Sequence, residues 1–306
     1  MKTTGLETPS GKRAGDENFP VGSLLLAPRV RPHVAIFYAF ARAADDIADN
    51  PHLSPEDKIG RLDRMAASIT GLEVGDPALD KAHRMRESLT ESGVGPEHCL
   101  DLLAAFKQDA SKQRYGDWSE LMDYCEHSAN PVGRYLLDLH GEAQLFYPAA
   151  DALCTALQVL NHLQDVREDY RNLDRVYLPL DWLEGEGLDV SALDKPHAGG
   201  ALRRVLDLCL DRVAELLGAA RMLPEQLIDR RLAAESAAIV RLAMNLEGRL
   251  RRGDPLAERV AIPRFVFFRL VVAGVLGAFM RRGIRLGMKA QCRDRAIPSQ
   301  TDGSGV

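Results

Sequence analysis

The chain has 306 residues, of which 46% are hydrophobic, and this is enough for a substantial buried core. The formal net charge of −5 argues against nucleic acid as the main partner. Five cysteines without a CxxC pair suit a reducing compartment and exclude a zinc site of the usual cysteine spacing. Residues 1–16 lack the apolar stretch of a secretory signal, so we expect a cytoplasmic protein.

Nearly every segment of the chain has the periodicity of a helix, and none has the alternation that is typical of a strand. Proline and glycine separate the helical segments, as at Asn50-Pro51 and Asn130-Pro131. Ser54 followed by Pro55 has the pattern of a helix start. In chain order, we expect helices at about 20–27, 31–50, 55–71, 76–92, 97–112, 117–128, 131–146, 149–171, 200–221, 224–251 and 262–287.

The longest stretch without a predicted helix is 174–199, which follows the predicted helix 149–171. The pattern predicts a single all-α domain over residues 17–292, built as a helical bundle with a central cavity. We expect the two ends, 1–16 and 293–306, to be disordered.

Two predicted helices each carry aspartates four residues apart, a spacing that places both carboxylates on one helix face. The first pair is Asp45 and Asp49. The second pair is Asp165 and Asp169. Polar side chains share these faces: Tyr38 and Arg42 on the first helix, Gln158 and Asn161 on the second.

Two carboxylate faces turned toward each other would offer hard oxygen ligands, which Mg²⁺ prefers together with water and phosphate oxygens. Such a site suits a diphosphate ester carried by Mg²⁺. A solvated helix face explains either motif alone equally well, but it does not explain two matching polar stripes on largely apolar helices. We therefore predict that Asp45, Asp49, Asp165 and Asp169 are metal ligands.

Three segments together resemble the squalene and phytoene synthase family, whose members condense or rearrange prenyl diphosphates head to head. The first is residues 37–49, similar to the family element Tyr-x-x-x-Arg-x-x-Asp-Asp-x-x-Asp. The second is residues 157–170 with 175–179, and the third is 124–133, which is similar to the family helix Tyr-Cys-x-x-x-Ala-Gly-x-Val-Gly. The resemblance runs from about residue 18 to about residue 253.

The resemblance also implies roles for particular residues. The Mg²⁺ ligands of the family fall on the four aspartates named above, and its diphosphate-contacting arginine falls on Arg42. Gln158 and Asn161 match polar positions that line the cavity, and Tyr38 begins the first element. Together with Arg42 and Gln164, we expect these side chains to bind the substrate. The tyrosine implicated in catalysis falls on Tyr124.

Two departures from the family pattern narrow the expected function. Gln164 stands where most condensing members have arginine, which removes one positive charge near the diphosphates, and Asn130-Pro131 replaces the usual Gly-x. Both resemble a subgroup found in bacterial hopanoid gene sets. The resemblance implies a hydroxysqualene synthase, which takes presqualene diphosphate from a sister enzyme and adds water. Squalene, dehydrosqualene or phytoene synthesis from two prenyl diphosphates stays open as the alternative.

The segment 265–280 is apolar but is interrupted by Arg269, and Arg281-Arg282 follow it. Such a stretch with a basic end could touch an anionic membrane surface. A core helix with a solvated basic end fits the same residues, and the sequence leaves both interpretations open.

Overall fold

The computed structural model describes residues 25–294, with side chains through residue 280. In this part of the chain the structure is helical, without a β-strand; Arg114 and Val176 form an isolated bridge. The prediction of an all-α fold is confirmed. The helices are α1 (Arg31–Ala48), α2 (Pro55–Ile69), α3 (Asp80–Ser92), α4 (Glu97–Asp109), α5 (Trp118–Ser128), α6 (Asn130–His140), α7 (Tyr147–Gln164), α8 (Val166–Leu173), α9 (Leu180–Gly185), α10 (Gly200–Ala220), α11 (Leu223–Gln226), α12 (Arg230–Leu250) and α13 (Arg264–Asp294). Short 3₁₀ turns lie at Pro77–Leu79, Gln144–Phe146 and Val190–Asp194.

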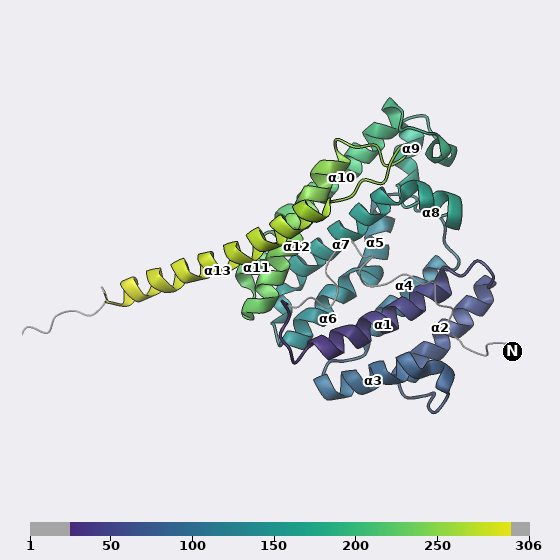
Figure 1. Cartoon of the computed structure of the whole chain (residues 1–306). Helices are drawn as coiled ribbons and strands as arrows, with labels where there is room; N and C mark the ends of the chain where they lie inside the picture. Colours follow the sequence, from purple (N-terminus) through teal and green to yellow (C-terminus); the bar gives the residue numbers. More distant parts are fainter. Residues whose placement is uncertain (1–24, 295–306) are drawn as a thin grey trace, which may run out of the picture.

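The first predicted motif lies on α1, which packs against α2, α3 and α4 (Figure 1). Apolar residues of α1, such as Phe40 and Ile47, are fully buried, so the opposite face carries the polar stripe. Helix α2 begins as predicted, because the Ser54 side chain accepts a hydrogen bond from the Asp57 amide at 3.2 Å. The α1 face is thereby fixed by packing on three neighbouring helices.

The second predicted motif begins on α7, which packs against α5, α6, α10 and α12. Gly133 of α6 permits close contact with α7, since a Cβ at this position would lie 2.7 Å from Cys154 Sγ. Asn130 begins α6 and is buried; it accepts a hydrogen bond from Thr155 of α7 and donates one to Glu126 of α5. The polar replacement seen in the sequence therefore joins three helices.

Two predicted helices are shorter than the sequence suggested. A single helix over 149–171 is wrong, because α7 ends at Gln164 and α8 starts at Val166, with Asp165 outside both. A helix over 131–146 is also wrong, because Gly141 adopts a left-handed conformation with φ 72° and ends α6 at His140. The 174–199 stretch contains the short α9 and a 3₁₀ turn, which the sequence pattern did not indicate.

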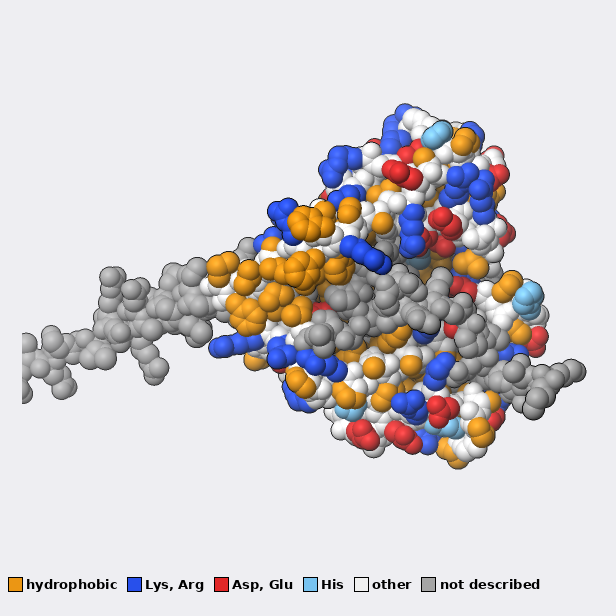
Figure 2. Space-filling model, viewed as in Figure 1, with side chains coloured by type: hydrophobic (Ala, Val, Ile, Leu, Met, Phe, Trp, Pro, Cys, Tyr) orange, Lys and Arg blue, Asp and Glu red, His pale blue; other side chains and the backbone are white. Residues whose placement is uncertain are grey.

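The long α13 packs along α12 and then extends beyond the other helices (Figure 1). Its outward side is mainly hydrophobic over the described side chains, as Figure 2 shows. Within residues 25–294, none of the helices combines the length and the apolar character needed to cross a bilayer. The predicted disordered ends, 1–16 and 293–306, lie almost wholly outside the described residues, as does most of the predicted helix 20–27.

Candidate active site

The first motif forms a small charged group at the end of α1. Arg42 contacts Asp45 at 3.0 Å and Asp46 at 3.3 Å, and all three side chains remain partly or slightly exposed. Asp49 caps the carboxyl end of α1, and its amide donates to the Asp45 carbonyl. Arg42 and the carboxylates of Asp45 and Asp46 thus lie together within about one turn of helix.

The second motif straddles the break between α7 and α8. The Asp165 amide donates to the Asn161 carbonyl, and the Asp169 amide donates to the Asp165 carbonyl at 2.8 Å. This second hydrogen bond is of the helical type, so Asp165 and Asp169 lie one helical turn apart although α7 and α8 are separate helices. Arg259, from the segment before α13, lies 3.8 Å from the Asp165 carboxylate.

One residue, Arg175, joins the ends of the two motifs. Its amide donates to the Asp169 carbonyl at 3.1 Å, and its guanidinium pairs with the Asp49 carboxylate at 2.6 Å. The same guanidinium donates to the carbonyls of Ala48 and Asp109. Because a single arginine spans this separation, the carboxyl ends of both motifs lie within one side-chain length of each other.

A buried carboxyl group, Asp109, lies beside this arginine at the end of α4. Its Oδ2 accepts a hydrogen bond of 2.9 Å from the Tyr124 hydroxyl. Burial raises the pKa of Asp109 to about 7, although Arg175 and the tyrosine hydrogen bond act in the opposite direction. Burial and the nearby Asp109 also raise the pKa of Tyr124 well above its usual range, so the hydroxyl keeps its proton.

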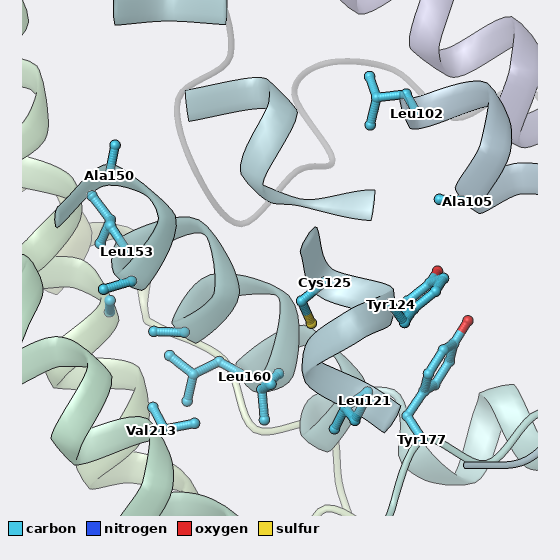
Figure 3. Packing of buried hydrophobic residues seen from close by; sticks show 14 of the residues in the cluster. Leu102, Ala105, Leu121, Tyr124, Cys125, Ala150, Leu153, Leu160, Tyr177 and Val213 are labelled. Atoms are coloured by element: carbon cyan, nitrogen blue, oxygen red, sulfur yellow. The ribbon is translucent and has the colours of Figure 1, made fainter. Parts of the chain in front are cut away.

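Aromatic side chains surround Tyr124. Tyr177 lies with its ring centroid 5.7 Å from that of Tyr124, and Figure 3 shows the two rings side by side with their hydroxyls on the same side. His162 stacks on Tyr177, and Tyr115 packs against both tyrosines. Burial lowers the pKa of His162 to about 3, so its ring is neutral near pH 7. The rings of His162 and Tyr115 therefore lie against the two tyrosines, Tyr124 and Tyr177.

Hydrogen bonds between loops position this aromatic group. The Val176 amide donates to Gln113, and the Leu180 amide donates to Tyr115, so the segment after α8 runs beside the segment after α4. Tyr177 lies between these two contacts. The segment 175–179, which the resemblance singled out, therefore brings Arg175 and Tyr177 to the end of α4.

The other predicted polar residues differ in their positions. Gln158 and Asn161 are partly buried on α7, and the Gln158 amide lies 3.1 Å from the His162 ring nitrogen. Tyr38 is partly buried on α1, one turn before Arg42. Gln164 is 1% exposed, and its amide donates to the Val260 carbonyl. The substrate contacts predicted for these four side chains stay predictions.

Asp109, Tyr177 and His162 are residues whose place in the site the sequence reasoning missed. Asp109 belongs to no motif, and no pattern singled out His162 within the segment 157–170. Their proximity to Tyr124 depends on chain segments far apart in the sequence. The residues of 175–179 were recognised as a family segment, but no pattern connected Arg175 with Asp49, which is 126 positions away.

The carboxylates of the two aspartate motifs suit a hard cation. Asp45, Asp49 and Asp165 have side chains about one-third exposed, so their carboxylates can be reached from solvent. Among the described residues, no three acidic, histidine or cysteine side chains come close enough to form a metal site by themselves. Mg²⁺ commonly binds through one or two carboxylates with waters and substrate phosphates, so the carboxylates present fit this ion.

The helical bundle and the paired acidic motifs define the all-α isoprenoid synthase class. The sequence pattern of the squalene/phytoene synthase family matches residues 12–266, so the chain belongs to this family. Two solved structures show the same fold: squalene synthase HpnC from Alicyclobacillus acidocaldarius, with a TM-score of 0.68 and 31% identity over 78% of this chain and 90% of that one, and a dehydrosqualene synthase, with a TM-score of 0.69 and 18% identity over 87% and 93%.

Two curated relatives are similar over most of their length. Hydroxysqualene synthase of Rhodopseudomonas palustris is 41% identical over 96% of this chain and 100% of its own length. Hydroxysqualene synthase of Zymomonas mobilis is 44% identical over 82% of this chain and 84% of its own. The resemblance drawn from the three sequence segments is confirmed.

Proposed function

We propose that this protein is a hydroxysqualene synthase, which converts presqualene diphosphate and water to hydroxysqualene and diphosphate with Mg²⁺ as its metal. The reaction is that of a carbon–oxygen lyase rather than a prenyltransferase. A sister enzyme would supply presqualene diphosphate. The similarity to hydroxysqualene synthases over most of the chain supports this choice within the family.

The observation that carries the proposal is the position of Arg175. Its guanidinium binds Asp49 and its backbone amide binds the Asp169 carbonyl, so the two motifs lie side by side. One diphosphate group could therefore contact both motifs. Arg42 and Arg259 add positive charge beside Asp45 and Asp165. A leaving diphosphate accumulates negative charge as its bond breaks, and fixed cations stabilise that charge.

Asp45, Asp49, Asp165 and Asp169 would hold Mg²⁺, which when bound supplies Lewis-acid stabilisation of the diphosphate. In the proposed reaction the carbon–oxygen bond to diphosphate breaks, and the leaving group takes the electron pair. The carbocation rearranges and water forms the new carbon–oxygen bond, after which one proton is lost. Arg42, which is partly exposed beside Asp45, would orient the diphosphate, and the buried Arg175 would hold Asp49 in position for it.

The aromatic group offers a surface for the carbocation. The faces of Tyr124 and Tyr177 attract a cation through the ring quadrupole, with about 0.5–2 kcal/mol per ring. The Tyr124 hydroxyl, held by Asp109, can orient the attacking water. Asp109 can accept the proton that this water loses, because burial raises the pKa of Asp109 to about 7. His162 is neutral and adds no positive charge that would oppose the cation.

The alternative is head-to-head condensation of two prenyl diphosphates. Position 164 bears on this choice, because condensation places two diphosphates in the site and calls for more compensating charge. Gln164 is neutral and its amide is engaged with the Val260 carbonyl. We therefore favour the reaction that handles one diphosphate at a time.

The test is to give the purified protein either presqualene diphosphate or farnesyl diphosphate, with Mg²⁺ and without NADPH, and to analyse the lipid extract by mass. We expect hydroxysqualene from presqualene diphosphate and little or no C30 product from farnesyl diphosphate. Efficient formation of presqualene diphosphate or squalene from farnesyl diphosphate would overturn the proposal in favour of a condensing synthase. The Asp45→Asn variant is the control for product that does not depend on the site.

A further inference from the structure

The outward side of α13 is an exposed hydrophobic strip. Its large side chains recur every three or four residues and are therefore on one helix face. The strip consists of Phe265, Phe268, Val272, Leu276, Phe279 and Met280, which are between 38% and 70% exposed. Figure 2 shows hydrophobic side chains gathered along the described part of α13. An apolar strip of this kind marks a surface that contacts something other than water.

The opposite side of α13 is fixed against α12. Gly274 is buried, and a Cβ there would lie 2.6 Å from the Cα of Ala238, so the two helix backbones are in direct contact. Gly277 of α13 faces Arg241 of α12. Because these glycines are on the side opposite the strip, α13 cannot turn its hydrophobic face inward without breaking this packing.

The charge of this segment differs from that of the whole chain. Residues 264–293 contain no acidic residue but include seven basic ones: Arg264, Arg269, Arg281, Arg282, Arg285, Lys289 and Arg293. The chain as a whole has a net charge of −5. In the described part, Arg264 and Arg269 are exposed beside the strip, and the Arg269 guanidinium lies over the Phe265 ring at 5.6 Å.

We propose that the strip on α13 lies on the surface of a membrane that contains anionic lipids. A helix with an exposed apolar face and basic neighbours is held at such an interface by apolar burial together with attraction to anionic headgroups. The strip occupies one face of α13 while Gly274 is buried against α12 on the other, which suits a helix lying in the interface plane. A second copy of the chain is a poorer occupant, because two such strips would bring their basic residues together without acidic partners.

This inference stands apart from the proposed function, because it concerns residues away from the aspartate motifs and is tested without substrate. The experiment is flotation of the purified full-length protein with vesicles of phosphatidylcholine alone or of phosphatidylcholine mixed with phosphatidylglycerol. We expect binding to the mixed vesicles, weakening as salt is raised, and at least about tenfold weaker binding to phosphatidylcholine alone.

Two sets of variants separate the apolar and the charged contributions. Phe268→Ser with Leu276→Ser should weaken binding to the mixed vesicles by at least about tenfold, because both side chains would be buried in the interface. Arg264→Ala with Arg269→Ala should weaken binding and reduce its salt dependence. The matched control is Leu72→Ser with Leu145→Ser, since these side chains are 85% and 72% exposed elsewhere on the surface, and it should bind like the wild type.

Circular dichroism establishes that each variant is folded, and sedimentation without vesicles gives its oligomeric state. Failure of the wild-type protein to float with the mixed vesicles would overturn the proposal. Equal binding by Phe268→Ser with Leu276→Ser and by the wild type would also overturn it. A wild-type dimer that this variant converts to a monomer, with no vesicle binding, would assign the strip to a second copy instead.

Discussion

Replacing Asp109 by asparagine should change how the stability of the protein depends on pH. Asp109 is 4% exposed, and burial raises its pKa from 3.8 to about 7. Between these two values the folded state holds a proton that the unfolded state has released. The free energy of unfolding of the wild type therefore falls as pH rises through this window, and the fall is complete above about pH 7.

The size of the effect follows from the shift. A change of about three pKa units corresponds to about 4 kcal/mol, of which roughly 3 kcal/mol develop between pH 5 and pH 8. Asparagine at this position has no charge to lose and can still accept the hydrogen bond from Tyr124. Asp109→Asn should therefore gain stability relative to the wild type as the pH is raised.

The assay is urea unfolding of both proteins at a series of pH values, with the exposed Asp123→Asn on α5 as the control. The difference in unfolding free energy between Asp109→Asn and the wild type should grow by roughly 3 kcal/mol from pH 5 to pH 8, whereas Asp123→Asn should follow the wild type. A difference for Asp109→Asn that is constant with pH would refute the reasoning, because it would mean that Asp109 is ionised in the folded protein throughout this range.

Asp45→Asn and Asp165→Asn should each lower turnover by orders of magnitude with unchanged helical content, and a near wild-type rate in both would remove the aspartates from the metal site. Tyr124→Phe should lower kcat more than it changes KM, because the hydroxyl that Asp109 orients is lost; steady-state kinetics with an unchanged kcat would leave Tyr124 a packing role. Arg175→Met should lower the free energy of unfolding by about 3 kcal/mol, because a buried guanidinium loses its pair with Asp49 and its hydrogen bonds to two backbone carbonyls, whereas Arg171→Met, at an exposed pair, should cost less than about 1 kcal/mol. Equal small losses in these two variants would mean that Arg175 does not hold the motifs together.

The helices could be predicted from the sequence wherever local signals set their limits. Helix α2 begins after Ser54 because a serine side chain caps the next turn, and this signal lies within four residues. The break at Asp165 could not be predicted in this way, because α7 and α8 read as one continuous helical pattern. The left-handed Gly141 is a local signal for the end of α6 that the sequence prediction passed over.

The candidate site divides in the same way. The spacing of Asp45 and Asp49 shows that they share a helix face, because that relation depends on helix geometry alone. The contact between Arg175 and Asp49 depends on how α1, α4 and the segment after α8 pack, and no local pattern encodes it. The buried position of Asp109 likewise results from tertiary packing, and with it the raised pKa that distinguishes this carboxyl group.

The most direct test of the proposed function is to run the reaction with presqualene diphosphate in water enriched in the heavy isotope ¹⁸O and to measure the mass of the alcohol formed. If water ends the reaction, hydroxysqualene should carry heavy oxygen from the solvent, in the same proportion as the solvent itself. The label should disappear, together with the product, in the Asp45→Asn protein. An alcohol that contains only ordinary oxygen, or a hydrocarbon in place of the alcohol, would contradict the proposal that this protein adds water to the rearranged cation.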